Sequence, residues 1–146
     1  MTVKKTNVKQ AVPFLGVTNM ESSLKFYVNG LGFQIQKQWI PEGDGHYPGE
    51  GRVIWCWLQL GEAAIMLQEF PPEGRPKEAL GCGVNLCFQC EDALALYREF
   101  KARGIGVRSR PFVGNRMWVV PLTDPDGYRL EFESPTDAAE ETELEE

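Results

Sequence analysis

The sequence predicts an α+β domain built from two copies of one βαβββ module, and three observations support this. Residues 11–70 and 83–135 show the same order of predicted elements: an alternating strand, an amphipathic helix and three further strands. Each helix ends near a glycine, Gly32 or Gly104. Each copy closes on a turn and an alternating strand, LGEAAIMLQE or DPDGYRLEFE. An internal repeat of this kind constrains the fold more strongly than local propensity does.

The elements of the first module follow from local patterns. Asn19 is a suitable N-cap for the helix, and the buried stripe of that helix contains Tyr27. A loop rich in glycine and proline, residues 41–51, holds the only histidine, His46, which we expect to be exposed, with a lid over a pocket as the alternative. Strands are expected at residues 12–18, 33–40, 53–60 and 64–68.

The second module follows residues 71–82, which we interpret as a linker. Its helix carries the apolar stripe of Leu96, Tyr97 and Phe100. The turn at residues 124–127, Asp-Pro-Asp-Gly, joins the last two strands, because these residue types suit tight turns. Strands are expected at residues 85–89, 107–112, 117–122 and 128–133.

Composition indicates one domain, residues 1–136. The chain has 146 residues and is 42% hydrophobic, which is enough for a sizeable core. No apolar run approaches the roughly 20 residues of a membrane span, and no signal-peptide pattern opens the chain. Four cysteines are too few for a disulfide framework. We therefore expect a cytoplasmic protein with no membrane partner.

The net charge of −6 comes from the last ten residues. Six of the 21 acidic residues lie at 137–146, so 15 remain to balance the 15 lysines and arginines. Because this tail has no apolar periodicity, we predict that it is disordered and dispensable for the fold and for ligand binding. With no basic stripe, nucleic acid is not an expected partner.

Strand parity predicts which side chains line the space between the two half-sheets, since successive side chains point to opposite faces. In each of four strands one face is aliphatic and should pack on a helix, and the other is mixed and should line the cavity. The predicted cavity wall consists of Val12, Phe14, Met66, Gln68, Asn85, Cys87, Gln89, Glu131 and Glu133.

The repeat resembles the vicinal oxygen chelate superfamily, which includes glyoxalase I, extradiol dioxygenases and bleomycin-resistance proteins. The matching stretches are VTNMESSLKFYVNGLGF, LGEAAIMLQE, DALALYREFKARGI and LTDPDGYRLEFESP. The resemblance implies two modules that form a cupped, incomplete mixed β-barrel with flanking helices, usually in a homodimer. It places the metal ligands of metal-dependent members at Val12, Met66, Asn85 and Glu131. Only Glu131 is a suitable ligand for a hard cation, so we predict no metal and no cofactor.

Large aromatic side chains are numerous in the predicted strands around the cup. Trp55 and Trp57 share one face, although parity leaves open whether that face meets the cup or the helices. A flat organic ligand stacking on these rings is the functional interpretation, and ordinary sheet core is the alternative. Glu131 is the one candidate for a catalytic role. The predicted ligand-binding residues are Phe14, Trp55, Trp57, Met66, Gln68, Asn85, Cys87, Trp118 and Glu131.

We interpret the sequence as a metal-independent binder of a small, partly aromatic organic molecule, nearest the bleomycin-resistance type, that sequesters an antibiotic or a metabolite in a homodimer. The first alternative is an enzyme, a metal-dependent lyase, isomerase or dioxygenase that uses Glu131. The second is a domain that has lost its ligand and only dimerises.

Overall fold

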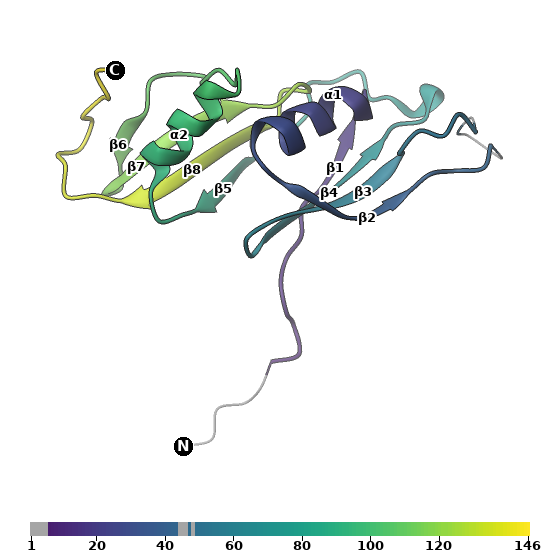
Figure 1. The fold of residues 1–146 in the computed structure, drawn as a ribbon, viewed down its shortest axis with the longest axis horizontal. Coiled ribbons are helices and arrows are strands. Elements are labelled where there is room, and N and C mark those ends of the chain that lie inside the picture. Colours follow the sequence, from purple (N-terminus) through teal and green to yellow (C-terminus); the bar gives the residue numbers. More distant parts are fainter. Residues whose placement is uncertain (1–5, 44–46, 48) are drawn as a thin grey trace.

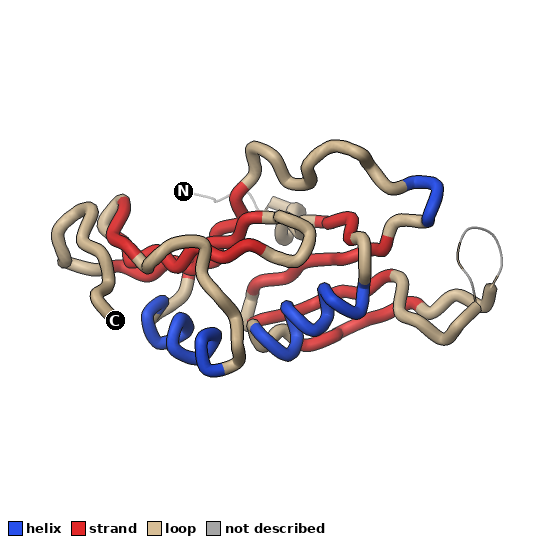
Figure 2. Tube along the Cα trace, turned by 90° about the horizontal axis from the view of Figure 1, so that it is seen from above, coloured by secondary structure: helices blue, strands red, loops and turns tan. Residues whose placement is uncertain are grey.

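The two predicted modules are present in the computed structural model, which describes residues 6–43, 47 and 49–146. Two four-stranded sheets lie side by side along the long axis, with both helices on one side of the molecule (Figures 1 and 2). The α+β prediction with two βαβββ modules is confirmed. Strand pairing stays within each module among the described residues, so the barrel is incomplete.

Module one has the strand order β1-β4-β3-β2. Its strands β1 and β4 are parallel, and the other neighbours are antiparallel. The helix begins as α1 and continues into a π-helical segment, η1, whose Gly30 lies against Ile105 of module two so closely that a Cβ would come within 2.5 Å of Cδ1. The elements are β1 (Phe14–Val17), α1 (Met20–Leu24), η1 (Lys25–Gly30), β2 (Gln34–Trp39), β3 (Trp55–Leu60), β4 (Ala63–Glu69) and, after the sheet, a 3-10 turn η2 (Pro72–Gly74).

Module two repeats this arrangement in the order β5-β8-β7-β6. Strand β6 starts at Phe112, where the sequence predicted a strand ending, because residues 107–111 form no ladder with β7. None of the described helices is long and apolar enough to span a membrane. The elements are β5 (Asn85–Gln89), α2 (Ala93–Ala102), β6 (Phe112–Gly114), β7 (Met117–Thr123) and β8 (Arg129–Pro135).

The repeat extends to the way each sheet holds its helix. Asn19 and Asp92 are the N-caps and accept hydrogen bonds from Ser22 N and Ala95 N. The last strand of each module then supplies a second acceptor to the helix start. Glu69 Oε2 accepts from Met20 N at 3.0 Å, and Ser134 Oγ accepts from Ala93 N at 2.8 Å.

The core lies between the helices and one face of each sheet. Leu67 and Phe132 are buried there, on the strand faces opposite Met66 and Glu131. Met66 pairs with Phe14 as Glu131 pairs with Cys87, so the two residues occupy equivalent places, as the repeat predicted. Among the described residues, no helix covers the other face of either sheet (Figures 1 and 2).

The C-terminal segment 137–146 is docked rather than disordered, so the prediction of disorder is wrong. Leu144 packs against the core, and Glu141 N and Leu144 N donate to the carbonyls of Val113 and Pro111. Both oxygens of Glu140 accept backbone N–H groups, from Asn115 and Arg116. The acidic tail therefore pairs with the edge of β6, which composition alone cannot reveal.

Candidate ligand-binding face

Register places five of the predicted site residues together on the helix-free face of module one. Two rows of paired residues cross the sheet from β1 through β4 and β3 to β2, and each row contains a tryptophan of β3. The first row is Phe14, Met66, Trp57 and Lys37, and the second is Gly16, Gln68, Trp55 and Trp39. This answers the question that parity left open, because both tryptophans of β3 face away from the helices.

The aromatic rings of this face are partly exposed. Phe14 is 56% exposed and Trp39 is 44% exposed, which is unusual for side chains of this size. The ammonium of Lys37 lies 5.5 Å from the centre of the Trp57 ring, and the indole N–H of Trp57 donates to Gln59 at 2.9 Å. The face therefore combines apolar rings with a cation and an amide.

A pocket of about 320 Å³ opens beside Phe14 and Gln68 on this face. Tyr47 forms part of its wall, and its hydroxyl receives a hydrogen bond from Gln68 Nε2 at 3.1 Å. Phe70 lies against Gly16, where a Cβ would come within 2.1 Å of the ring. Tyr47, Gly16 and Phe70 were not among the predicted site residues. A glycine on an otherwise bulky strand was the only sequence signal for this close approach.

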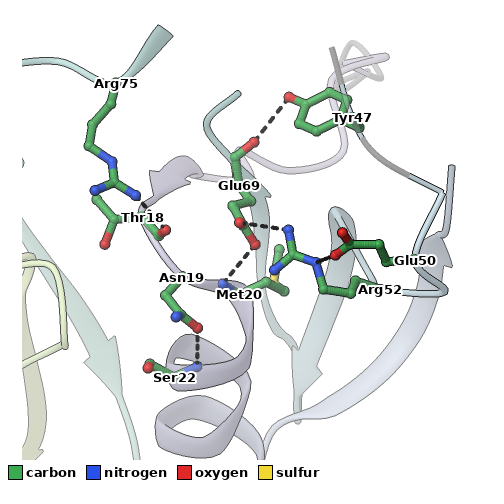
Figure 3. A network of polar contacts seen from close by, with 9 residues as sticks. All are labelled: Thr18, Asn19, Met20, Ser22, Tyr47, Glu50, Arg52, Glu69 and Arg75. Carbon is green, nitrogen blue, oxygen red and sulfur yellow. Dashed lines mark hydrogen bonds and ion pairs between the residues drawn. The ribbon is translucent and has the colours of Figure 1, made fainter. Parts of the chain in front are cut away.

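A network of polar contacts holds Tyr47 and Glu69 in place at the edge of the pocket (Figure 3). The carboxylate of Glu69 accepts two hydrogen bonds. One comes from Met20 N at the start of α1, at 3.0 Å, and the other from the guanidinium of Arg52, at 3.1 Å. Its backbone carbonyl accepts from the hydroxyl of Tyr47 at 3.0 Å. Arg75 lies on the other side of Glu69 and donates to the carbonyl of Thr18. Glu69 thus ties the loop residue Tyr47 to the helix and the sheet.

The remaining predicted residues lie on module two. Asn85, Cys87 and Glu131 share its helix-free face, where Cys87 pairs with Glu131. Trp118 pairs with Ser134, on the helix side of the sheet, and packs against the core. The prediction that it lies with the other site residues is therefore wrong. Its pairing with Ser134 puts its ring on the face opposite Glu131 and Glu133. His46 lies outside the described residues.

The acidic residues of module two shape the chemistry of this second face. Glu131 forms an ion pair with Arg108 at 3.5 Å. Desolvation of the thiol, together with the neighbouring carboxylates Glu133 and Glu131, raises the pKa of Cys87 to about 12. The thiol is therefore protonated at neutral pH and is a poor nucleophile.

Comparison with known proteins agrees with this architecture. Residues 8–132 match the model of the Glyoxalase/Bleomycin resistance protein/Dioxygenase superfamily. The chain belongs to this superfamily. No similar protein was found among curated sequences.

Solved structures of this superfamily share the fold at low sequence identity. The bleomycin-binding protein complexed with bleomycin is 23% identical, with a TM-score of 0.62 over 87% of this chain and 98% of the other. TnmS3, an antibiotic binding protein from Streptomyces sp. CB03234, is 20% identical, with a TM-score of 0.63 over 90% and 100%. The bleomycin resistance determinant encoded on the transposon Tn5 is 23% identical, with a TM-score of 0.63 over 90% and 100%.

The residues at the implied metal positions of the superfamily do not fit a metal. Val12 offers no donor atom, and the thioether of Met66 is a soft ligand that suits copper(I) better than a hard divalent ion. Asn85 is exposed and offers only a neutral amide. Glu131 alone cannot replace the three or four protein ligands that such a site needs.

Proposed function

We propose that this protein binds a small, partly aromatic organic molecule, without a metal, and sequesters it on the helix-free face. The observation that carries the proposal is the pair of aromatic rows on module one, next to a pocket of about 320 Å³. Rings of this size left half-exposed on a sheet face are typical of a binding surface. Solved structures that bind antibiotics with the same fold support the proposal.

Affinity should depend mainly on aromatic contact. Burying one ring face contributes on the order of 1–3 kcal/mol, whereas a neutral hydrogen bond adds about 1 kcal/mol. Trp55, Trp57 and Phe14 would supply the apolar contact. Polar groups such as Gln68, Asn85 and Glu131 would set the orientation of the ligand.

The test compares Trp57→Ala with Glu131→Gln by calorimetric titration, using bleomycin first and then a panel of aromatic antibiotics. We expect Trp57→Ala to weaken binding by roughly 5- to 150-fold, the equivalent of about 1–3 kcal/mol, and Glu131→Gln to weaken it less. A chelator should leave the wild-type affinity unchanged. The reverse order, with Glu131→Gln abolishing binding or turnover, would favour the metal-dependent enzyme. Circular dichroism of each variant controls for folding.

We also propose that the protein acts as a homodimer. Ile35 and Val84 are exposed in the single chain and are not among the residues that we assign to ligand contact, and a second copy would cover apolar side chains of this kind. Light scattering coupled to size exclusion should give twice the mass of the 146-residue chain. A mass of one chain at micromolar concentration would contradict this proposal without affecting ligand binding.

A further inference from the structure

Two arginines line a second pocket next to the aromatic rows of module one. This pocket has a volume of about 310 Å³, and Arg52 and Arg75 form part of its wall. Three of its other lining residues, Tyr47, Glu69 and Phe70, also line the pocket of about 320 Å³ described above, so the two pockets adjoin. We refer to the second pocket as the arginine pocket.

Both guanidinium groups are anchored by the protein. Arg52 Nη2 donates to Glu69 Oε1 at 3.1 Å, and Glu69 is only 9% exposed. Arg75 Nη2 donates to the carbonyl of Thr18 at 2.9 Å. The two arginines lie on opposite sides of Glu69 (Figure 3). Because a guanidinium has five N–H donors, each arginine keeps donors for a ligand while one N–H fixes its position.

The charge of Arg75 is not explained by the fold. Among the described residues Arg75 forms no ion pair, and the carbonyl of Thr18 is a neutral acceptor. Thr18 precedes the N-cap Asn19, and the helix dipole does not favour a cation at the start of a helix. Arg103, by contrast, donates to the carbonyl of Gly30 at the end of η1, where the dipole favours a cation. The helix of module one therefore accounts for Arg103 but not for Arg75.

The charge of Arg52 is shared between two different carboxylates. The carboxylate of Glu69 accepts from Met20 N and from Arg52, so its charge is compensated inside the fold. Glu50 lies 3.6 Å from Arg52 Nε, and its side chain is 64% exposed. A surface ion pair of this kind contributes little to stability. The carboxylate of a ligand can therefore replace Glu50 at Arg52.

We propose that the arginine pocket binds the carboxylate of an aromatic acid whose rings lie on the aromatic rows. The proposal rests on the proposed function and names its class of ligand, a planar aromatic monocarboxylate. The N–H groups of a guanidinium form a planar fork that matches a carboxylate. A doubly charged phosphate would meet twice the repulsion from the carboxylate of Glu69, so a single negative charge fits this pocket better.

The test compares 2-naphthoate with 2-naphthamide, which has the same rings but no charge, by calorimetric titration of the full chain. We expect wild type to bind the acid about tenfold more tightly than the amide, as hydrogen bonds to charged groups at an exposed arginine imply. Arg75→Gln should remove this preference and leave the affinity for the amide unchanged. Arg110→Gln, which changes an exposed arginine outside the pocket, should keep the preference. Added salt should weaken binding of the acid only.

Glu50→Gln tests the same contact in the opposite direction. It removes the carboxylate that competes for Arg52, so the acid should bind more tightly and the amide should not. Damage to the fold cannot produce such a gain, and the melting temperature of each variant provides a further control. An unchanged affinity for the acid would overturn the part assigned to Arg52.

Trp57→Ala separates this proposal from the proposed function, because it should weaken both probes equally. Equal affinities of wild type for acid and amide would overturn the carboxylate site while leaving the aromatic rows as a binding surface. A preference for the acid that survives Arg75→Gln would also overturn it. Failure of both probes to bind at millimolar concentration would exclude this class of ligand, and the titration with antibiotics decides the proposed function by itself.

Discussion

Cys87 shows how neighbours override the intrinsic chemistry of a residue. It is exposed, which usually favours reaction of a thiol. Its environment opposes this, because desolvation of the thiol and the two carboxylates beside it raise the pKa of Cys87. Cys90, three residues on, points the other way and donates to the carbonyl of Glu133. A joint redox role for the two cysteines is therefore excluded by their directions.

We predict that Cys87 reacts slowly with iodoacetamide. The pKa of Cys87 is raised from 9.0 to about 12. Its thiolate fraction at pH 8 is therefore far below that of an ordinary cysteine, because each increase of one in the pKa lowers that fraction about tenfold. The measurement is peptide mass spectrometry on the Cys82→Ser variant as a function of time. Adding Glu133→Gln should accelerate labelling at Cys87. Equal rates with and without that substitution would show that Glu133 does not control the thiol.

The edge strand β6 illustrates how an element depends on distant chain. It is only three residues long, and an edge of this kind exposes unpaired backbone groups. The C-terminal segment covers it, with Phe112 bridging to Glu143 and Val113 N donating to the carbonyl of Thr142. The acidic C-terminal segment thereby completes the outer edge of module two.

We predict that deleting residues 137–146 destabilises the protein, in contrast to the expectation from sequence. Leu144 packs on the core, and burial of a leucine contributes up to about 1.5–3 kcal/mol. A fall in melting temperature of several degrees is the expected result, measured by calorimetry. Leu144→Ala should reproduce most of it. Glu146→Gln is the matched control, since its ion pair with Arg98 lies at the surface and contributes little.

The two modules are joined by a buried polar contact, not by a continuous sheet. The Tyr27 hydroxyl, from module one, donates to Asp124 of module two at 2.8 Å. The carboxylate of Asp126 accepts from the backbone N–H and from the hydroxyl of Thr18, and the hydroxyl of Tyr128 donates to the carbonyl of Gly16 at 2.8 Å. The Asp-Pro-Asp-Gly turn, expected only to link two strands, therefore also fixes the modules relative to each other.

This contact predicts a pH dependence of stability. Burial raises the pKa of Asp124 above its ordinary value of 3.8, and the hydrogen bond from Tyr27 opposes this. Between the pKa of Asp124 in the unfolded chain, 3.8, and its raised pKa in the folded protein, the folded protein binds more protons than the unfolded chain. The contribution of Asp124 to stability therefore falls as pH rises through this range. The advantage of wild type over Asp124→Asn in the free energy of unfolding should be larger at pH 4 than at pH 7.

Tyr27→Phe separates the hydrogen bond from burial. It should lower the free energy of unfolding by about 1.5–3 kcal/mol at neutral pH, because the buried carboxylate loses a donor. It should also steepen the fall in stability with pH, since the pKa of Asp124 then rises further. Urea titrations at several pH values measure both effects. A Tyr27→Phe profile parallel to that of wild type would contradict the assigned role of the bond.

The repeat, the fold class and the members of each strand face could be predicted from the order of the amino acids. These follow from local periodicity, and a period of two is visible without knowing any neighbour. Parity places Trp55 with Trp57, and Cys87 with Asn85, because side chains two residues apart on a strand share a face. The superfamily was also evident from the helix and turn motifs.

How those faces meet depends on strand register and packing, which could not be predicted from local patterns. Register across β3 and β4 turned Trp55 and Trp57 away from the helices, whereas register across β7 and β8 turned Trp118 toward them. The docking of the tail and the approach of Tyr47 to the pocket depend on hydrogen bonds between segments far apart in the chain. Such contacts have no local period, because they arise from the sum of packing and pairing over the whole molecule.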